Sequence, residues 1–232
     1  MKKGLRARFF ATLLPVLSRG HVGLSEPWRK KLLGSLAGKV LEIGPGTGVN
    51  LAYLPDGVHW IGLELNPYFH PHLKQALSLR GLSGEVLLGQ AEAIPLPEES
   101  VEAVVATLVL CSVEDPRGAL AEILRVLKPG GRLVFLEHVA APRGSSLRRF
   151  QDLLCPLWSF LGDGCHPNRE TLALIREAGF ARVEAEAFEL PLPPGGPPCG
   201  RGGLEGIALS APARGCPFRP PRPANPPPGD GR

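Results

Sequence analysis

One stretch of sequence decides the fold: Val40-Leu41-Glu42-Ile43-Gly44-Pro45-Gly46-Thr47-Gly48-Val49-Asn50. Its first part is an apolar-rich run, typical of a buried parallel strand, and its second part is a loop with glycine at every second position. Because glycine has no Cβ, this loop can take positive φ angles and can let a ligand approach the backbone closely. In a parallel α/β sheet, such a ligand binds at the carboxyl ends of the strands.

The spacing of the glycines narrows the kind of ligand. A dinucleotide-binding fingerprint, G-x-G-x-x-G, needs a glycine where this chain has Val49. The pattern is instead E-x-G-x-G-x-G, which begins at Glu42 and contains Gly44, Gly46 and Gly48. A glycine triplet alone also fits a structural turn that binds nothing, so the choice between the two depends on a second signal.

A carboxylate provides that signal. Trp60 to Leu65 is typical of a second buried strand, and Glu64 near its end follows Gly48 by 16 positions. A carboxylate in this place can accept hydrogen bonds from both hydroxyls of a ribose. A later stretch, Lys128-Pro129-Gly130-Gly131, completes the pattern. Together these residues resemble the class I S-adenosylmethionine (SAM) methyltransferases over roughly residues 36–190.

The resemblance implies SAM as cofactor and an α/β fold. The implied fold is a doubly wound, Rossmann-like sheet of seven mostly parallel strands, with the last strand antiparallel. The stretch Gln90-Ala91-Glu92 would meet the adenine, although from the residues alone it is equally a polar loop. The cofactor-binding residues that the resemblance implies are Glu42, Gly44, Gly46, Gly48, Glu64, Leu65, Gln90, Ala91, Glu92, Thr107 and Leu108.

Periodicity and chain breakers predict the remaining elements. Asn66-Pro67 is expected to begin a helix that ends near Leu79, with Gly81 as its C-cap. Asp115 is expected to begin an amphipathic helix. Further helices are predicted over 5–18, 27–36 and 49–54, and further strands over 86–89, 101–110, 132–136, 182–188 and 203–209.

The composition suits one soluble globular domain with appendages, since 44% of the 232 residues are hydrophobic. We expect a basic helical leader at 1–35, a methyltransferase domain at 36–210 and a disordered tail at 211–232. The tail is predicted from its breakers, because residues 191–232 contain 13 of the 26 prolines and nine of the 29 glycines.

Positive charge is concentrated near the N-terminus. Residues 1–40 contain nine Lys or Arg and one acidic residue, a balance of +8 against +4 for the whole chain. Such a leader can meet an anionic membrane surface or nucleic acid, or it can be a solvated helical face. No aromatic residues are interleaved to stack on bases, and no Pro-Pro-aromatic signature follows the strand at 101–110. We therefore expect no nucleic-acid partner.

The five cysteines include no C-x-x-C pair, which argues against a disulfide framework and a zinc site and favours a reducing compartment. The apolar run at 9–17 is interrupted by Pro15 and is far shorter than the ~20 residues that span a bilayer. We expect a cytoplasmic protein with at most a peripheral membrane contact through the basic leader. The oligomeric state is left open.

Four short stretches resemble a narrower group in the same order. They are Thr107–Val113, Glu137-His138-Val139, Gly162–Cys165 and Asn168–Thr171. The group is methyltransferase-like, and its animal members are thiol S-methyltransferases anchored to endoplasmic reticulum and lipid droplets. Two features differ here: the leader is shorter than the animal anchor, and Gly203–Ala208 lacks the histidine of the group's His-Ile-x-Gly-x-Ala run.

The resemblance implies methyl transfer from SAM to a small lipophilic acceptor, with an alkyl thiol as the best candidate. The displacement needs alignment and exclusion of water, and we expect no metal. His138 is the candidate base, or else a structural histidine, while Cys111, Asp163 and His166 are expected to line the acceptor pocket. A quinone, phenol or phospholipid is an alternative acceptor, and a non-catalytic SAM-binding protein is an alternative function.

Overall fold

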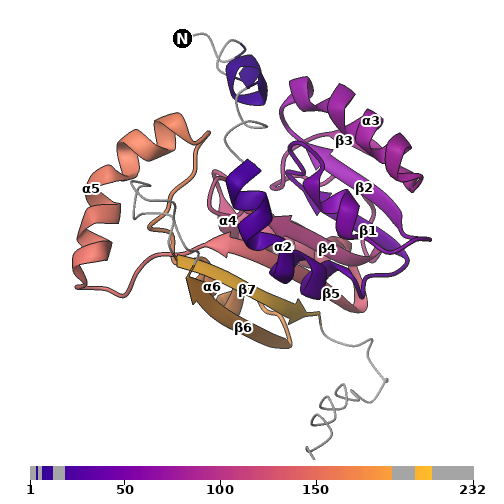
Figure 1. Ribbon diagram of the computed structural model, residues 1–232. Helices are drawn as coiled ribbons and strands as arrows, with labels where there is room; N and C mark the ends of the chain where they lie inside the picture. The colour runs from indigo at the N-terminus through magenta and orange to yellow at the C-terminus, as the bar shows by residue number, and fades with distance from the viewer. Residues whose placement is uncertain (1–3, 5–6, 13–18, 190–201, 211–232) are drawn as a thin grey trace, which may run out of the picture.

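The computed structural model describes residues 4, 7–12, 19–189 and 202–210. Its centre is a seven-stranded sheet with the order β3-β2-β1-β4-β5-β7-β6 (Figure 1). All pairs are parallel except those of β7, which runs antiparallel to both β5 and β6. This confirms the predicted doubly wound sheet with an antiparallel last strand. The strands are β1 (Lys39–Ile43), β2 (His59–Glu64), β3 (Ser83–Leu88), β4 (Val101–Thr107), β5 (Leu127–His138), β6 (Arg182–Glu189) and β7 (Gly202–Leu209).

Helices cover both faces of the sheet, and each face has its own apolar core. On one face Trp60 packs with Leu33 and Leu73 from two of the helices. On the other face Leu41 and Phe135 pack with Ile123. The first face carries α2 (Arg19–Leu33), the 3-10 turns η1 (Val49–Tyr53) and η2 (Pro67–Phe69), and α3 (His70–Arg80); the second carries α4 (Pro116–Val126) and α6 (Thr171–Glu177), while α5 (Ser146–Leu161) lies to one side (Figure 1).

The strand order creates a topological switch point at the carboxyl edge of the sheet. From β1 the chain moves outward to β2 and β3, and then returns to place β4 on the other side of β1. The loops after β1 and β4 therefore leave the sheet in opposite directions, which is the switch point where ligands bind in such folds. The E-x-G-x-G-x-G stretch and Thr107 both lie at this switch point.

The element boundaries differ from the predictions at several places. The strand predicted over 101–110 ends at Thr107, because Leu108 takes a φ of 56° and leaves the extended conformation. The strand predicted from residue 132 begins at Leu127, so Gly130-Gly131 lies within β5 beside a register shift. The helix at 49–54 is the 3-10 turn η1, and the helix predicted from Pro27 begins at Arg19 and runs through that proline. Helices α5 and α6 were not predicted.

Parts of the leader and the tail lie outside the described residues. Residues 7–12 are helical, but 13–18 of the predicted first helix are not described, nor is the predicted tail at 211–232. Within the described part of the chain, no helix combines the length and apolar character needed to cross a membrane.

Candidate active site

The glycine loop after β1 has the backbone conformation that its sequence predicted. Gly44, Gly46 and Gly48 have φ angles of 58°, 55° and 78°, in the left-handed region that side chains with a Cβ disfavour. A Cβ on Gly44 would also lie only 2.6 Å from Cγ2 of Val109. The glycine loop and the loop after β4 therefore touch, which brings two predicted parts of the site together.

Glu64, at the end of β2, ties the glycine loop to the next turn. Its Oε2 accepts a hydrogen bond of 3.0 Å from the N–H of Gly46, and its Oε1 accepts one of 2.8 Å from the N–H of Asn66. Burial raises the pKa of this carboxyl, and the two backbone donors oppose that shift. Each oxygen keeps a second lone pair that could accept a hydroxyl hydrogen, while the neighbouring Leu65 is exposed.

Glu42 lies in a buried polar network below the loop. Its two oxygens accept hydrogen bonds of 2.8 Å from Asn50 Nδ2 and from Trp60 Nε1. The amide of Asn50 also donates to Thr107 Oγ1 at 2.9 Å, and Arg29 donates to Oδ1 of Asn50. Burial raises the pKa of Glu42. The network joins α2, β1, η1, β2 and β4, and the sequence analysis missed Arg29 and Asn50 as parts of it.

The predicted adenine stretch follows β3. Ala91 is buried and Gln90 is exposed, while Oε1 of Glu92 accepts a 3.1 Å hydrogen bond from the N–H of Asp115. Because Asp115 caps α4, this contact fixes the stretch against the start of that helix. The roles of these residues toward adenine stay predictions.

The loop after β4 is held from below by a fully buried carboxylate. Glu137 accepts hydrogen bonds from the backbone N–H groups of Val109, Leu110 and Cys111, at 2.9, 2.8 and 3.2 Å. Burial raises the pKa of Glu137 to about 7. Arg169 donates to the carbonyls of this loop at Leu110 and Val113, at 2.6 and 2.8 Å. The sequence analysis quoted Glu137 and Arg169 within motifs but gave neither a role.

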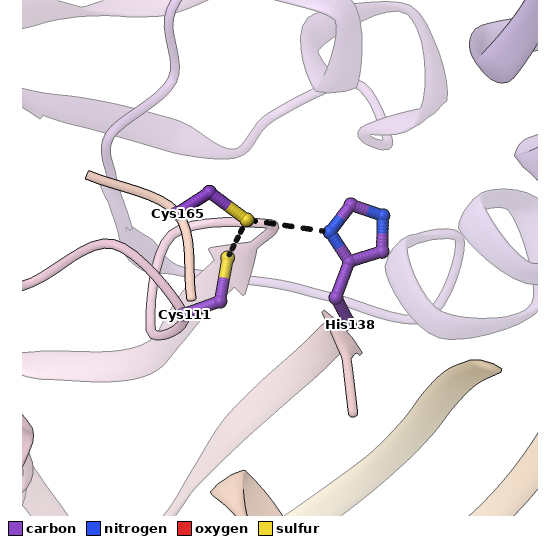
Figure 2. A group of neighbouring side chains, drawn as sticks. All are labelled: Cys111, His138 and Cys165. Atoms are coloured by element: carbon purple, nitrogen blue, oxygen red, sulfur yellow. Dashed lines mark hydrogen bonds between the residues drawn. The ribbon is translucent and has the colours of Figure 1, made fainter. Parts of the chain in front are cut away.

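Three side chains meet above this loop, and we call them the thiol–imidazole cluster: Cys111, His138 and Cys165 (Figure 2). Sγ of Cys165 lies 3.5 Å from Sγ of Cys111 and 3.8 Å from Nδ1 of His138. The hydrogen bond between the two thiols, helped by His138, lowers the pKa of Cys165 to about 4 and raises that of Cys111 well above its usual range. The sequence analysis found no group of metal-ligating residues, because these three come from separate segments of the chain.

The loop that carries Cys165 also carries Asp163 and His166, the other predicted acceptor residues. The N–H of His166 donates to the carbonyl of Cys111 at 2.9 Å, which fixes this loop against the loop after β4. Nδ1 of His166 is buried, with no hydrogen-bond partner among the described residues. Asp163 is exposed, has a φ of 51° and faces Glu64 closely enough to affect its pKa. The structure thus gathers His138, Cys111, Asp163 and His166 at one edge of the sheet.

Comparison with known proteins identifies the family of the chain. Residues 41–135 match the family described as methyltransferase domain. Thiol S-methyltransferase TMT1B of Homo sapiens is 37% identical over 195 residues, which is 79% of this chain and 80% of the human protein. The chain belongs to this methyltransferase family. The rat TMT1B is 43% identical over 63% of this chain, and the chain covers only 62% of the rat protein's length.

More distant relatives share the domain. Demethylmenaquinone methyltransferase of Clavibacter sepedonicus is 30% identical over 70% of this chain and 75% of its own length. Among solved structures, a SAM-dependent methyltransferase of Thermotoga maritima superposes with a TM-score of 0.62 at 22% identity, covering 88% of this chain and 99% of that one. This structural likeness supports the methyltransferase fold.

Proposed function

We propose that the chain transfers the methyl group of SAM to the sulfur of a small thiol. The observation that carries the proposal is the match over 79% of the chain to a protein named as a thiol S-methyltransferase. The arrangement of the site supports it, because Cys111 follows β4 and His138 ends β5, so the thiol–imidazole cluster lies at the same carboxyl edge as the proposed SAM site. The proposed methyl acceptor is a small molecule and not a nucleic acid.

The switch point at the carboxyl edge of the sheet is the proposed SAM site. Glu64 would accept the ribose hydroxyls on its remaining lone pairs, and the glycine loop would pass beneath the methionine part. Leu65 and the stretch 90–92 would border the adenine, and Thr107 and Leu108 would border the sulfonium. Glu42 would act largely through the loop that it supports, because both of its oxygens already accept buried hydrogen bonds.

The acceptor would enter from the side of α5. This helix exposes large apolar side chains along one face, namely Phe150, Leu153, Leu157 and Phe160. Such a surface suits a lipophilic molecule that must leave water before it reacts. His138 ends β5 beside Cys111 and Cys165, and we propose that it assists the removal of the thiol proton. The sulfur would then attack the methyl group in line with the sulfonium leaving group.

The test is methyl transfer from tritiated SAM to a panel of thiols, phenols, quinones and phospholipids, with extraction of the methylated product. The proposal expects a labelled thioether and S-adenosylhomocysteine in equal amounts. Turnover of a quinone or phenol without turnover of any thiol would favour the second candidate, which the similarity to demethylmenaquinone methyltransferase supports. SAM binding without turnover of any acceptor would favour a non-catalytic SAM-binding protein.

We further propose that the protein works in the cytoplasm and touches membranes only through its basic leader. The leader contains Lys2, Lys3, Arg6 and Arg8 before α2 begins at Arg19. Each basic residue near an anionic membrane contributes about 1 kcal/mol of attraction, which salt screens.

A further inference from the structure

The thiol–imidazole cluster has the geometry of a metal site. Its three potential ligand atoms all lie within 4.8 Å of one another. A tetrahedral zinc ion has ligands at about 2.3 Å for sulfur and about 2.0–2.1 Å for nitrogen, which places ligand atoms roughly 3.5–3.8 Å apart. The two separations from Cys165 are 3.5 Å to Cys111 and 3.8 Å to His138, so small side-chain movements would complete the site.

The backbone around the cluster holds these side chains in place. The N–H of Cys111 donates to the buried carboxylate of Glu137 at 3.2 Å, and its carbonyl accepts from His166 at 2.9 Å. The N–H of Cys165 donates to the carbonyl of Gly162 at 3.1 Å. Both cysteines are at least nine-tenths buried. The backbone positions of Cys111 and Cys165 are therefore set by contacts that do not involve a metal.

The donor set selects the kind of ion. Thiolate and imidazole are ligands that zinc binds well, whereas magnesium and calcium prefer oxygen. Two thiolates and one neutral imidazole would balance the charge of Zn²⁺, so the buried site would be neutral.

We propose that Cys111, Cys165 and His138 bind one Zn²⁺ ion and leave its fourth position open for the acceptor sulfur. Three protein ligands with an open position are the arrangement of catalytic zinc sites, and Cys₂His sets occur among them. The binding of the ion stands on the cluster alone. The use of the open position rests on the proposed function.

The proposed zinc ion would activate the acceptor thiol for methyl transfer. The acceptor R–SH binds zinc as R–S⁻ and its proton leaves to solvent, because a coordinating thiol is deprotonated outright. The sulfur then forms a bond to the methyl carbon, the bond from that carbon to the sulfonium breaks, and its electron pair stays on S-adenosylhomocysteine. The product R–S–CH₃ is neutral and leaves the zinc. His138 would assist as a ligand rather than as a base.

The test uses the full chain, purified under reducing conditions without chelator. We expect about one zinc per chain by elemental analysis, and after its removal about one Co²⁺ per chain with the sulfur-to-cobalt charge-transfer band of thiolate ligation. Cys111→Ser and Cys165→Ser should each weaken Co²⁺ binding more than the 10–100-fold that loss of an outer-shell partner causes. Cys155→Ser is the matched control, because Cys155 is also buried but lies outside the cluster.

Several outcomes would overturn the inference. These are a parent protein that binds neither ion, cobalt bound without a thiolate band, or equal loss of binding in the Cys155→Ser control. A Cys111–Cys165 disulfide in reduced, anaerobic protein would do so as well. Failure of the two proposals can be told apart: zinc with no thiol turnover removes the proposed function, whereas thiol turnover by zinc-free protein removes the proposed use of the open position.

Discussion

Replacing Glu64 with alanine should weaken SAM binding by at least about tenfold. This carboxylate already accepts backbone hydrogen bonds from Gly46 and Asn66, at 3.0 and 2.8 Å. The ribose hydroxyls would use its remaining lone pairs. A hydrogen bond to a charged group contributes about 1.5–3 kcal/mol, and about 1.4 kcal/mol corresponds to a tenfold change in affinity. Loss of even one ribose contact therefore predicts a weakening of about tenfold to 100-fold.

Calorimetry measures this affinity directly. Glu85→Ala on the neighbouring strand β3 is the control, because Glu85 is exposed and lies within the strand rather than at its end. Glu64→Ala also leaves two backbone N–H groups without their acceptor, so the melting temperature of each variant must be checked first. Unchanged SAM affinity in a folded Glu64→Ala protein would refute the ribose assignment. Tighter binding of NAD than of SAM by the parent would refute the cofactor assignment.

The same carboxylate predicts a pH dependence. Ionised Glu64 accepts hydroxyl donors better than the protonated form, and burial raises its pKa above the usual value. SAM affinity should therefore fall as the pH decreases, and the fall should begin at a higher pH than for an exposed glutamate. Glu64→Gln cannot ionise, so its weaker affinity should not show this dependence. An identical pH profile in the parent and in Glu64→Gln would show that another group titrates.

Three further predictions follow from the site and the leader. Gly46→Val should abolish SAM binding as measured by calorimetry, because valine is strained at a φ of 55° and this residue lies in the glycine loop. Gly57→Val is the control: it introduces the same strain at a φ of 84°, but outside the site, and should retain SAM binding. His138→Ala should lower kcat/KM for a thiol by about 100-fold with little change in SAM affinity. The loss should shrink above the pKa of the thiol where His138 acts as a base and should persist where it acts as a zinc ligand; full activity at neutral pH would remove both roles. Deletion of residues 1–18 should abolish salt-sensitive binding to anionic vesicles in a flotation assay, and equal binding with and without them would contradict the role of the leader.

The sequence was sufficient for the cofactor half of the fold because its signals are local. Glycine at alternate positions predicted the positive φ angles at Gly44, Gly46 and Gly48, and the strand preceding Glu64 predicted the place of that carboxylate. The Asp115 cap and the Gly81 cap were also confirmed, because each depends on a few neighbouring residues.

The residues proposed to line the acceptor site were less predictable, because their contacts join segments that are distant in the sequence. Cys111 and Cys165 are 54 positions apart, and no spacing rule links them to each other or to His138. Glu137 follows an apolar run that predicts only a strand, yet its carboxylate organises the loop after β4. Helix α5 was missed because Pro156 lies inside it, where a proline normally argues against a helix.

The most direct test of the central claim is the product formed from methyl-labelled SAM and an alkyl thiol. The purified full chain should give the labelled methyl thioether together with an equal amount of S-adenosylhomocysteine, and Glu64→Ala should lose this activity at limiting SAM. If the parent forms no thioether from any thiol but methylates a phenol, quinone or phospholipid, thiol S-methylation is contradicted.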